Sequence, residues 1–188
     1  MPNLVVLFGP PASGKAAVGH ELARLAGYRF FHNHLTVDPV AALFGWENER
    51  FPRTLERVRD VLFEEVVSDE TIAGVVFTFV WALELREDTA YLERLARRFA
   101  RSGGSVHFVE LTASLPVRLA REGTPFRTRL KPSKVDVEAM RAHQLEVEAK
   151  HRMNTGGRLP LPYPHFVVDT ERHGPRDAAL RLWRSLQD

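Results

Sequence analysis

The first fifteen residues constrain this chain more than any other stretch. An apolar run, residues 3–8, leads directly into Gly9, and the following residues complete the pattern G-x-x-x-x-G-K at Gly14 and Lys15. This order predicts a buried strand, a turn and a helix, with successive backbone N–H groups of the turn surrounding phosphate oxygens. Lys15 would add a point charge, and the helix would direct its positive end at the anion. A chance glycine-rich turn is the alternative, and the strand–loop–helix order argues against it.

The residues expected to bind the phosphates are those of the loop and the two that follow it: Gly9, Pro10, Pro11, Ala12, Ser13, Gly14, Lys15, Ala16 and Ala17. In the usual pattern, a Ser or Thr follows the lysine and its hydroxyl binds Mg²⁺. Ala16 has no hydroxyl. The sequence therefore predicts phosphate binding and leaves magnesium binding open.

Composition excludes several classes of protein. The chain has 188 residues, 44% of them hydrophobic, which suits one domain with a full core. A net charge of +2 does not predict a broad nucleic-acid surface. The absence of cysteine excludes disulfides and cysteine zinc sites. No apolar run reaches the roughly 18 residues of a membrane span, and the first run is too short for a signal peptide. We therefore expect a cytoplasmic protein.

Apolar runs alternate with helical patterns, which is typical of a parallel sheet flanked by helices. Strands are expected at residues 4–8, 28–31, 74–80, 106–111 and 165–168, and helices at 14–26, 36–44, 52–68, 88–101, 114–122, 133–152 and 176–186. In the helix at 52–68, the apolar residues Leu55, Val58, Leu62 and Val66 recur at helical spacing. No repeat or linker interrupts the pattern, so we expect a single α/β domain over residues 1–188.

With these features, the chain resembles the shikimate kinase, gluconate kinase and chloramphenicol phosphotransferase group of small P-loop kinases. The resemblance in element order spans nearly the whole chain, and at motif level it is firm for residues 9–15. It implies a three-layer P-loop NTPase fold with a five-stranded parallel sheet in the order 2-3-1-4-5. It also implies ATP as a substrate, an acceptor-binding region at about residues 33–72 and a lid at about residues 122–135.

The segment at residues 31–38 is where the resemblance puts the acceptor. In the related kinases, an Asp at the end of the second strand orients or deprotonates the acceptor hydroxyl, or holds Mg²⁺ through water. Asp38 is the only carboxylate in this segment, so the resemblance gives it that role. Capping of a helix that begins at Pro39 is the alternative, because Asp before Pro is a common helix start.

Other residues near this segment are candidates for binding the acceptor. Asn33 and His34 are expected to hydrogen-bond it, and Arg57 is a candidate for recognising an anionic group. His32 and His34 alternate in a way that suggests a metal, but no third ligand follows at a matching spacing, and a loop held by satisfied histidines is a further alternative. Trp46 and Trp81 flank the presumed cleft, where packing is favoured over contact with an apolar or ring-shaped acceptor.

A basic stretch predicts the lid. Its members are Arg118, Arg121, Arg127, Arg129, Lys131 and Lys134. Phosphoryl transfer spreads negative charge over equatorial oxygens, which guanidinium groups stabilise. By resemblance, Arg121 is expected to stack on adenine, and Arg127 and Arg129 are expected near the phosphates. A solvated surface loop is the alternative.

Two further segments are candidates for contact with the cofactor or a metal. By resemblance, Asp169 and Thr170 are expected to line the adenine pocket, although Asp-Thr after a strand is also an ordinary turn. The third strand ends in Phe79-Val80-Trp81, with no Asp for magnesium, and neither Glu84 nor Glu110 is assigned as its replacement.

The preferred interpretation is an ATP-dependent phosphotransferase that acts on a hydroxyl of a small molecule, with Lys15, Asp38, Arg127 and Arg129 as its catalytic residues. No protein metal site is assigned, and Mg²⁺ would come with ATP. The alternative is a nucleotide-binding P-loop module with little or no kinase activity, because Ala16 replaces the magnesium ligand. Neither a nucleic acid nor a membrane is expected as a partner.

Overall fold

One parallel sheet organises the chain in the computed structural model, which describes residues 1–124 and 136–187. Its strands are β1 (Asn3–Phe8), β2 (Arg29–Phe31), β3 (Gly74–Thr78), β4 (Val106–Thr112) and β5 (His165–Asp169). They are hydrogen-bonded in the order β2-β3-β1-β4-β5, with every pair parallel. The predicted strand order is confirmed.

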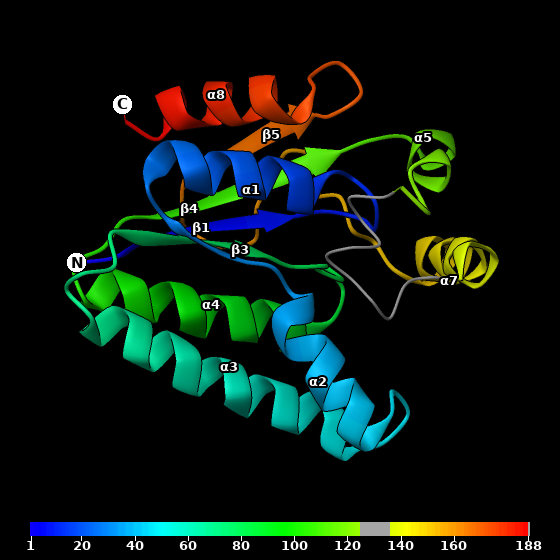
Figure 1. Cartoon of the computed structure of the whole chain (residues 1–188), viewed down its shortest axis with the longest axis horizontal. Helices are drawn as coiled ribbons and strands as arrows, with labels where there is room; N and C mark the ends of the chain where they lie inside the picture. The colour runs from blue at the N-terminus through cyan, green and yellow to red at the C-terminus, as the bar shows by residue number, and fades with distance from the viewer. Residues whose placement is uncertain (125–135, 188) are drawn as a thin grey trace.

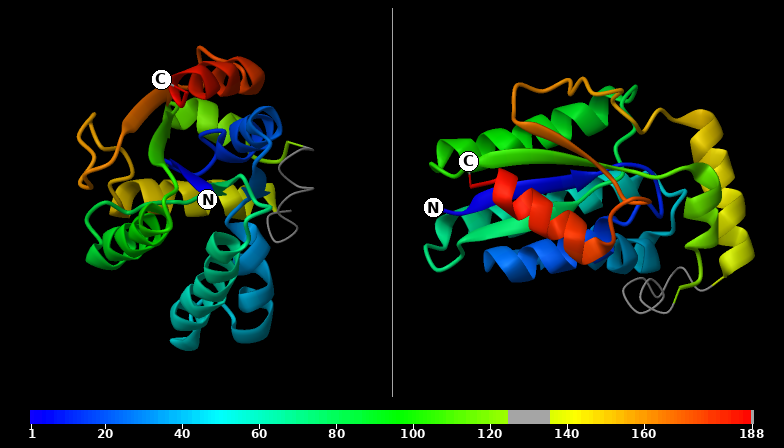
Figure 2. Two further views of the ribbon diagram at one scale, coloured as in Figure 1. Left: turned by 90° about the vertical axis from the view of Figure 1, so that its left-hand side faces the viewer. Right: turned by 90° about the horizontal axis from the view of Figure 1, so that it is seen from above.

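Helices cover both faces of the sheet (Figure 1). One face carries α1 (Lys15–Ala26) and α8 (Pro175–Ser185), and the other carries α3 (Arg50–Ser68) and α4 (Arg86–Arg101). The left-hand view in Figure 2 shows the same three layers. The remaining described helices are α2 (His34–Phe44), α5 (Leu115–Ala120) and α7 (Val137–Lys150), which lie toward the carboxyl ends of the strands.

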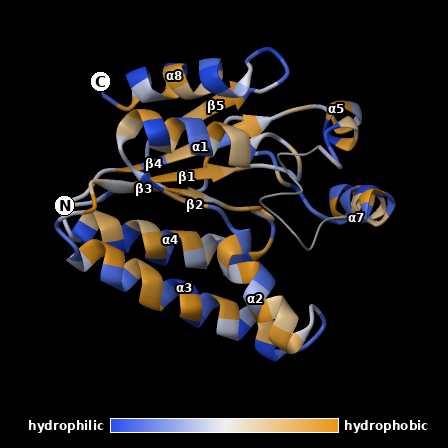
Figure 3. Ribbon diagram, viewed as in Figure 1, coloured by the Kyte–Doolittle hydropathy of each residue, from blue (hydrophilic) through white to orange (hydrophobic). Residues whose placement is uncertain are grey.

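The core explains why the first apolar run is unbroken. Along β1, Leu4, Val6 and Phe8 belong to the cluster packed against α3 and α4, whereas Val5 and Leu7 belong to the cluster packed against α1 and α8. All five are at most 1% exposed. A parallel strand covered on both faces has no polar side, and β1 is accordingly coloured mainly as hydrophobic in Figure 3.

The helix α3 buries a face that overlaps the predicted one in part, because Val66 packs against the core and Leu55 lines a cavity, whereas Val58 and Leu62 do not face inward. Its buried residues are Arg59 and Phe63, while Val58 and Leu62 are 37% and 44% exposed. Phe63 packs its ring against Phe77 of β3 at a centroid distance of 5.2 Å. Val58 and Leu62 are four residues apart, as Arg59 and Phe63 are. Helical periodicity alone therefore does not distinguish between these two neighbouring faces of the helix.

The helix α2 begins at His34, two residues before the predicted start, so the hypothesis that Asp38 caps this helix is wrong. The backbone N–H groups of Leu35 and Val37 donate to His32 O at 3.0 Å and Asn33 O at 3.2 Å, which closes the first turn ahead of Asp38. Pro39 lies inside the helix.

The predicted charged helix is α7. Asp136 caps it by accepting a hydrogen bond from Ala139 N at 2.9 Å, as expected of an N-cap carboxylate. The predicted start of this helix at Ser133 lies outside the described residues. Among the described residues, no helix has both the length and the apolar character needed to span a bilayer.

Candidate functional site

The loop between β1 and α1 has an unusual backbone. Gly9, Ala12 and Gly14 have φ angles of 131°, 59° and 96°, and Ala12 is the one non-glycine residue with positive φ in the described part of the chain. Glycine adopts such angles without steric cost, whereas alanine is strained there. A turn that combines left- and right-handed residues directs successive N–H groups toward one concave side, where an anion binds.

Lys15 completes this concave surface. Its Nζ donates to Gly9 O at 2.7 Å and Pro10 O at 2.6 Å, and lies 3.3 Å from Ser13 Oγ. The residue is 7% exposed and is the first residue of α1, so its charge adds to the positive end of the helix. Charge, loop N–H groups and helix terminus together form an arrangement suited to binding phosphate.

Two residues predicted to contact the nucleotide meet at this loop. Arg121 donates to Thr170 O at 2.7 Å and Thr170 Oγ1 at 2.9 Å, and lies 3.4 Å from Ala12 O. The Thr170 hydroxyl is 2.9 Å from Ser13 O. The loop after β5 and the end of α5 therefore hold the phosphate-binding loop between them. The carboxylate of Asp169 accepts from Glu171 N at 2.9 Å, as in an ordinary turn.

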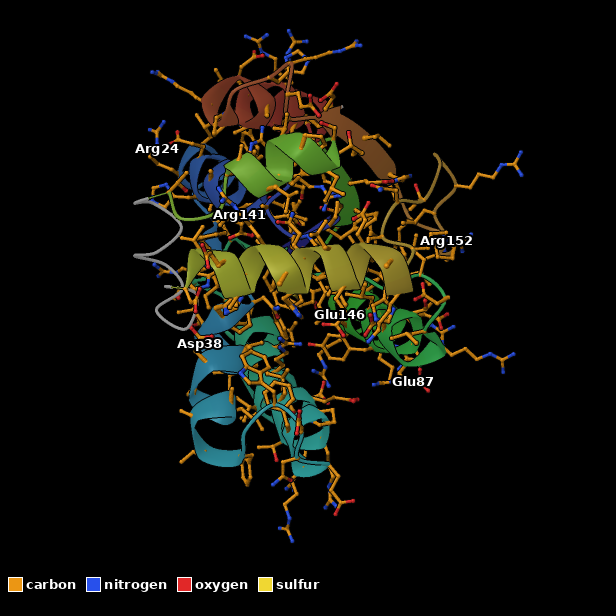
Figure 4. The ribbon with its side chains drawn as sticks, turned by 90° about the vertical axis from the view of Figure 1, so that its right-hand side faces the viewer. Arg24, Asp38, Glu87, Arg141, Glu146 and Arg152 are labelled. Atoms are coloured by element: carbon orange, nitrogen blue, oxygen red, sulfur yellow. The ribbon has the colours of Figure 1, made fainter. Side chains whose placement is uncertain are left out.

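The helix α7 lies across the carboxyl end of the sheet, as Figure 4 shows from that side. Gln144 of α7 donates to Pro11 O at 2.9 Å, and Glu148 accepts from Arg118 of α5 at 2.7 Å. Arg118 is 1% exposed and also donates to Ala113 O at 3.0 Å. Arg118 belongs to the basic stretch predicted as the lid, and it is instead a buried arginine that joins α5 to α7 through its ion pair with the partly exposed Glu148. No sequence signal identified Gln144 as a loop contact.

The residues after β2 are fixed to the neighbouring strand. Asn33 N donates to Thr78 Oγ1 at 3.0 Å, at the carboxyl end of β3. His34 follows as the first residue of α2 and is 8% exposed. Its Nδ1 lies 2.6 Å from Oδ1 of Asp38, one helical turn further along. The predicted acceptor residues Asn33, His34 and Asp38 are thus together.

A buried arginine that sequence reasoning missed supports this group. Arg59 of α3 hydrogen-bonds to Asn33 Oδ1 and, at 3.1 Å, to Thr36 Oγ1. Its guanidinium carbon lies 5.8 Å and 5.9 Å from the ring centroids of Phe79 and Tyr91, which is cation–π distance. Burial lowers the pKa of Arg59 from its ordinary value, and the planar charge remains suited to these partners.

One cavity of about 1080 Å³ joins the phosphate-binding loop to the acceptor residues. Lys15 and Arg121 line one part of it, and Asn33, His34 and Arg59 line another. Arg57 does not line it and instead borders a separate surface depression of about 410 Å³. The two arginines are two positions apart on α3, so they lie on opposite sides of the helix.

Apolar side chains form much of the wall around Arg59. Trp46 and Phe51 line the cavity with ring centroids 5.2 Å apart, and Trp46 is 57% exposed. Leu55 of α3 joins them. Trp81, by contrast, is fully buried and donates to Thr89 Oγ1 at 3.1 Å, so it belongs to the core.

The acids near the site have structural partners. Glu84 binds His151 Nδ1 at 2.5 Å, and Glu110 accepts from Thr155 N at 3.0 Å, so each ties a loop in place. Asp88 lines the cavity and accepts from Ala82 N at 2.9 Å, and burial raises the pKa of its carboxyl. Among residues 1–124 and 136–187, no group of three or more His, Cys, Asp or Glu side chains is arranged to hold a metal ion.

The predicted lid is described in part. Residues 125–135 lie outside the described residues, and the positions of Arg127 and Arg129 with them. Glu122 and Thr124 precede this segment, and Thr124 lines the cavity. Asp136, which caps α7, follows it.

Comparison with known sequences gives a partial match. No family profile matches the chain. A stretch of 62 residues is 42% identical to a shikimate kinase of Salinispora arenicola, and it makes up 30% of this chain and 37% of that protein. The match thus spans little more than a third of that curated relative.

Solved structures match over the whole chain. A shikimate kinase from Acinetobacter baumannii in complex with shikimate has a TM-score of 0.58 at 21% identity, over 100% of this chain and 94% of that one. A sugar kinase from Janibacter sp. has a TM-score of 0.61 at 18% identity, over 100% and 95%. A gluconokinase from Sinorhizobium meliloti has a TM-score of 0.56 at 20% identity, over 99% and 95%. At these identities the likeness establishes the fold, and the predicted resemblance to the shikimate and gluconate kinase group is confirmed at that level.

Proposed function

We propose that this protein is an ATP-dependent phosphotransferase that moves the γ-phosphate of ATP to a hydroxyl of a small molecule. The observation that carries the proposal is the single cavity shared by Lys15 and His34. A donor bound on the loop and an acceptor bound at the end of β2 would face each other inside it. Its volume, about 1080 Å³, suits two small molecules at once, because sites for one drug-sized ligand measure about 300–1,000 Å³.

Each part of the cavity has a proposed role. Lys15 and the N–H groups of the loop would hold the β- and γ-phosphates, and Arg121 with Thr170 would contact the base side of the nucleotide. Arg127 and Arg129 remain proposed as lid residues that reach the phosphates. Catalysis of this kind is mostly positioning and charge stabilisation, which suits a site built from fixed amides and cations.

The residues around the loop do not fit a directly bound magnesium ion. Ala16 presents a methyl group, and Glu84 and Glu110 are occupied by His151 and Thr155. We therefore propose that Mg²⁺ enters with ATP, held by phosphate oxygens and water, and that no side chain at position 16 assists. The absence of a hydroxyl at Ala16 also favours the second candidate function, a nucleotide-binding module that transfers phosphate poorly.

The wall of the acceptor end favours a molecule with an apolar body. Trp46, Phe51 and Leu55 line it beside the buried charge of Arg59. Burying apolar surface contributes about 25 cal/mol per Å² to binding. A polyol without an apolar face would bury little such surface against this wall and would gain little binding energy from it. The fold shared with shikimate kinase and gluconokinase supports a hydroxylated small molecule as the acceptor. The apolar wall favours, within that class, acceptors that also carry an apolar body.

The test is production of ADP by the purified protein with ATP and a panel of small hydroxyl compounds, with and without Mg²⁺. The panel should pair polar polyols and sugar acids with alcohols that carry a ring or an alkyl body. We expect turnover that depends on both the acceptor and Mg²⁺, and fastest with the second set. Tight ATP binding with no acceptor-dependent turnover would favour the nucleotide-binding module.

A further inference from the structure

The pairing of His34 with Asp38 changes the role that each would have in phosphate transfer. His34 lines the cavity and Asp38 does not. Nδ1 of His34 is 2.6 Å from Oδ1 of Asp38, and the side chains are 8% and 21% exposed. A carboxylate bound to one ring nitrogen of a histidine fixes the proton on that nitrogen and leaves the other as the acceptor. Asp38 thus lies one helical turn along α2 from a histidine that lines the cavity, and it contacts that histidine.

We propose that His34 Nε2 receives the proton of the acceptor hydroxyl and that Asp38 is a positioning residue that acts through His34. The inference rests on the phosphotransferase function proposed above. It revises the expectation that the carboxylate of Asp38 acts on the acceptor directly.

The ring of His34 is well placed for this role. The preceding residue, Asn33, is fixed to the end of β3 through Thr78 Oγ1, at 3.0 Å. Arg59 bonds to both Asn33 and Thr36, on either side of His34 in the sequence. The first turn of α2 is therefore anchored to the sheet and to α3, and it holds His34 at the wall of the cavity that Lys15 also lines. Preorganisation of this kind is what proton transfer requires.

The step balances without any further reagent. The acceptor oxygen forms a bond to the γ-phosphorus, and the bond from that phosphorus to the β–γ bridging oxygen breaks, which releases ADP. The hydroxyl proton passes to Nε2 of His34. The imidazolium is stabilised by the carboxylate of Asp38 and then returns its proton to water.

An ordinary structural pair is the competing explanation, because a His and an Asp four residues apart on a helix attract each other in any context. The two explanations differ in their kinetics. A structural pair affects folding and binding of both substrates, whereas a base and its positioning residue affect kcat and leave ATP affinity unchanged.

The experiment measures acceptor-dependent turnover for wild type, His34→Gln, Asp38→Asn and the double variant. General base catalysis typically contributes about 10²–10⁴-fold, so His34→Gln should lose that much kcat, with KM for ATP changed less than about threefold. Asp38→Asn alone should lower kcat. Added to His34→Gln, it should lower kcat little further, because its effect passes through His34. His107→Gln, a variant of a β4 histidine outside the cavity, is the matched control and should retain turnover.

Chemical rescue gives a second readout that folding alone does not change. Added imidazole should restore part of the kcat of His34→Ala and none of the kcat of Lys15→Ala. If His34 variants fail to fold, ¹⁵N spectra of wild type still report the ring, and we expect the proton of neutral His34 on Nδ1. Full turnover in His34→Gln, independent losses at the two positions, or a neutral ring protonated on Nε2 would overturn the inference. A wild type that phosphorylates no acceptor would instead overturn the proposed function and this step together.

Discussion

Replacement of Gly9 by alanine tests the geometry on which the phosphate-binding loop depends. Gly9 has φ of 131°, and a Cβ atom built there would lie 2.3 Å from the backbone oxygen of Leu111. Carbon and oxygen atoms in contact are normally separated by about 3.5 Å. Leu111 belongs to β4, which is bonded to β1 on one side and β5 on the other. The oxygen therefore cannot move without shifting the centre of the sheet.

The expected loss of stability has two parts. A side chain in a sparsely populated backbone region costs about 1–3 kcal/mol, and overpacking against atoms that cannot relax costs about 1–3 kcal/mol more. Gly9→Ala should therefore lower the free energy of unfolding by about 2–6 kcal/mol. For a chain of this length, that loss corresponds to a fall in Tm of at least about 4 °C.

Gly157→Ala is the matched control. Gly157 also has a positive φ, 86°, but a Cβ atom there would meet nothing within 4 Å. The control carries the backbone cost and not the clash. Urea unfolding of the two variants beside wild type measures the difference, which should be about 1–3 kcal/mol. Equal losses would refute the claim that contact between the loop and β4 fixes the loop.

Three other predictions concern phosphate, metal and protons. Lys15→Ala should weaken ATP binding by about 10–100-fold without lowering Tm by more than a few degrees, because one charged hydrogen-bond donor is lost; calorimetry with ATP measures this, and unchanged affinity in a folded variant would contradict the loop assignment. Ala16→Ser should tighten binding of Mg-ATP and leave binding of metal-free ATP unchanged, so an equal gain in both titrations would argue against a metal ligand at that position. Burial lowers the pKa of His107 from its ordinary value of 6.5. As the pH falls, the unfolded chain therefore takes up this proton before the folded chain does, and the free energy of unfolding decreases below about pH 6.5. Between pH 7.5 and 5.5, the free energy of unfolding should decrease less for His107→Gln than for wild type.

The fold was predictable because its strongest signals are local. The run from Asn3 to Phe8 has no polar face, which only a doubly covered strand tolerates, and the glycines that follow it require the turn that the structure contains. Strand order came from the resemblance to known kinases, because periodicity places strands along the chain and says nothing about which of them are neighbours.

The acceptor end was predicted less well, for a physical reason. Helical spacing groups Leu55 and Val66 with Val58 and Leu62 on one face. Leu55 and Val66 do face inward, yet the buried positions between them are Arg59 and Phe63. A buried guanidinium is stable only with hydrogen-bond acceptors and ring faces around it. Those partners come from α2, β3 and α4, and sequence spacing does not bring them together.

The two ends of the cavity are built in different ways, and this has consequences for which functions the fold can acquire. The phosphate-binding loop is held by three other segments of the chain, through Thr170 after β5, Arg121 after α5 and Gln144 of α7. A change there alters several backbone contacts at once. The acceptor end is formed mainly by residues of α2 and α3, among them Arg59. Its apolar wall includes the exposed Trp46. Substitutions at Trp46 or Phe51 should therefore change which acceptor is used while leaving ATP affinity within about threefold, because no hydrogen bond joins that wall to the loop in the described residues and distant sites act independently.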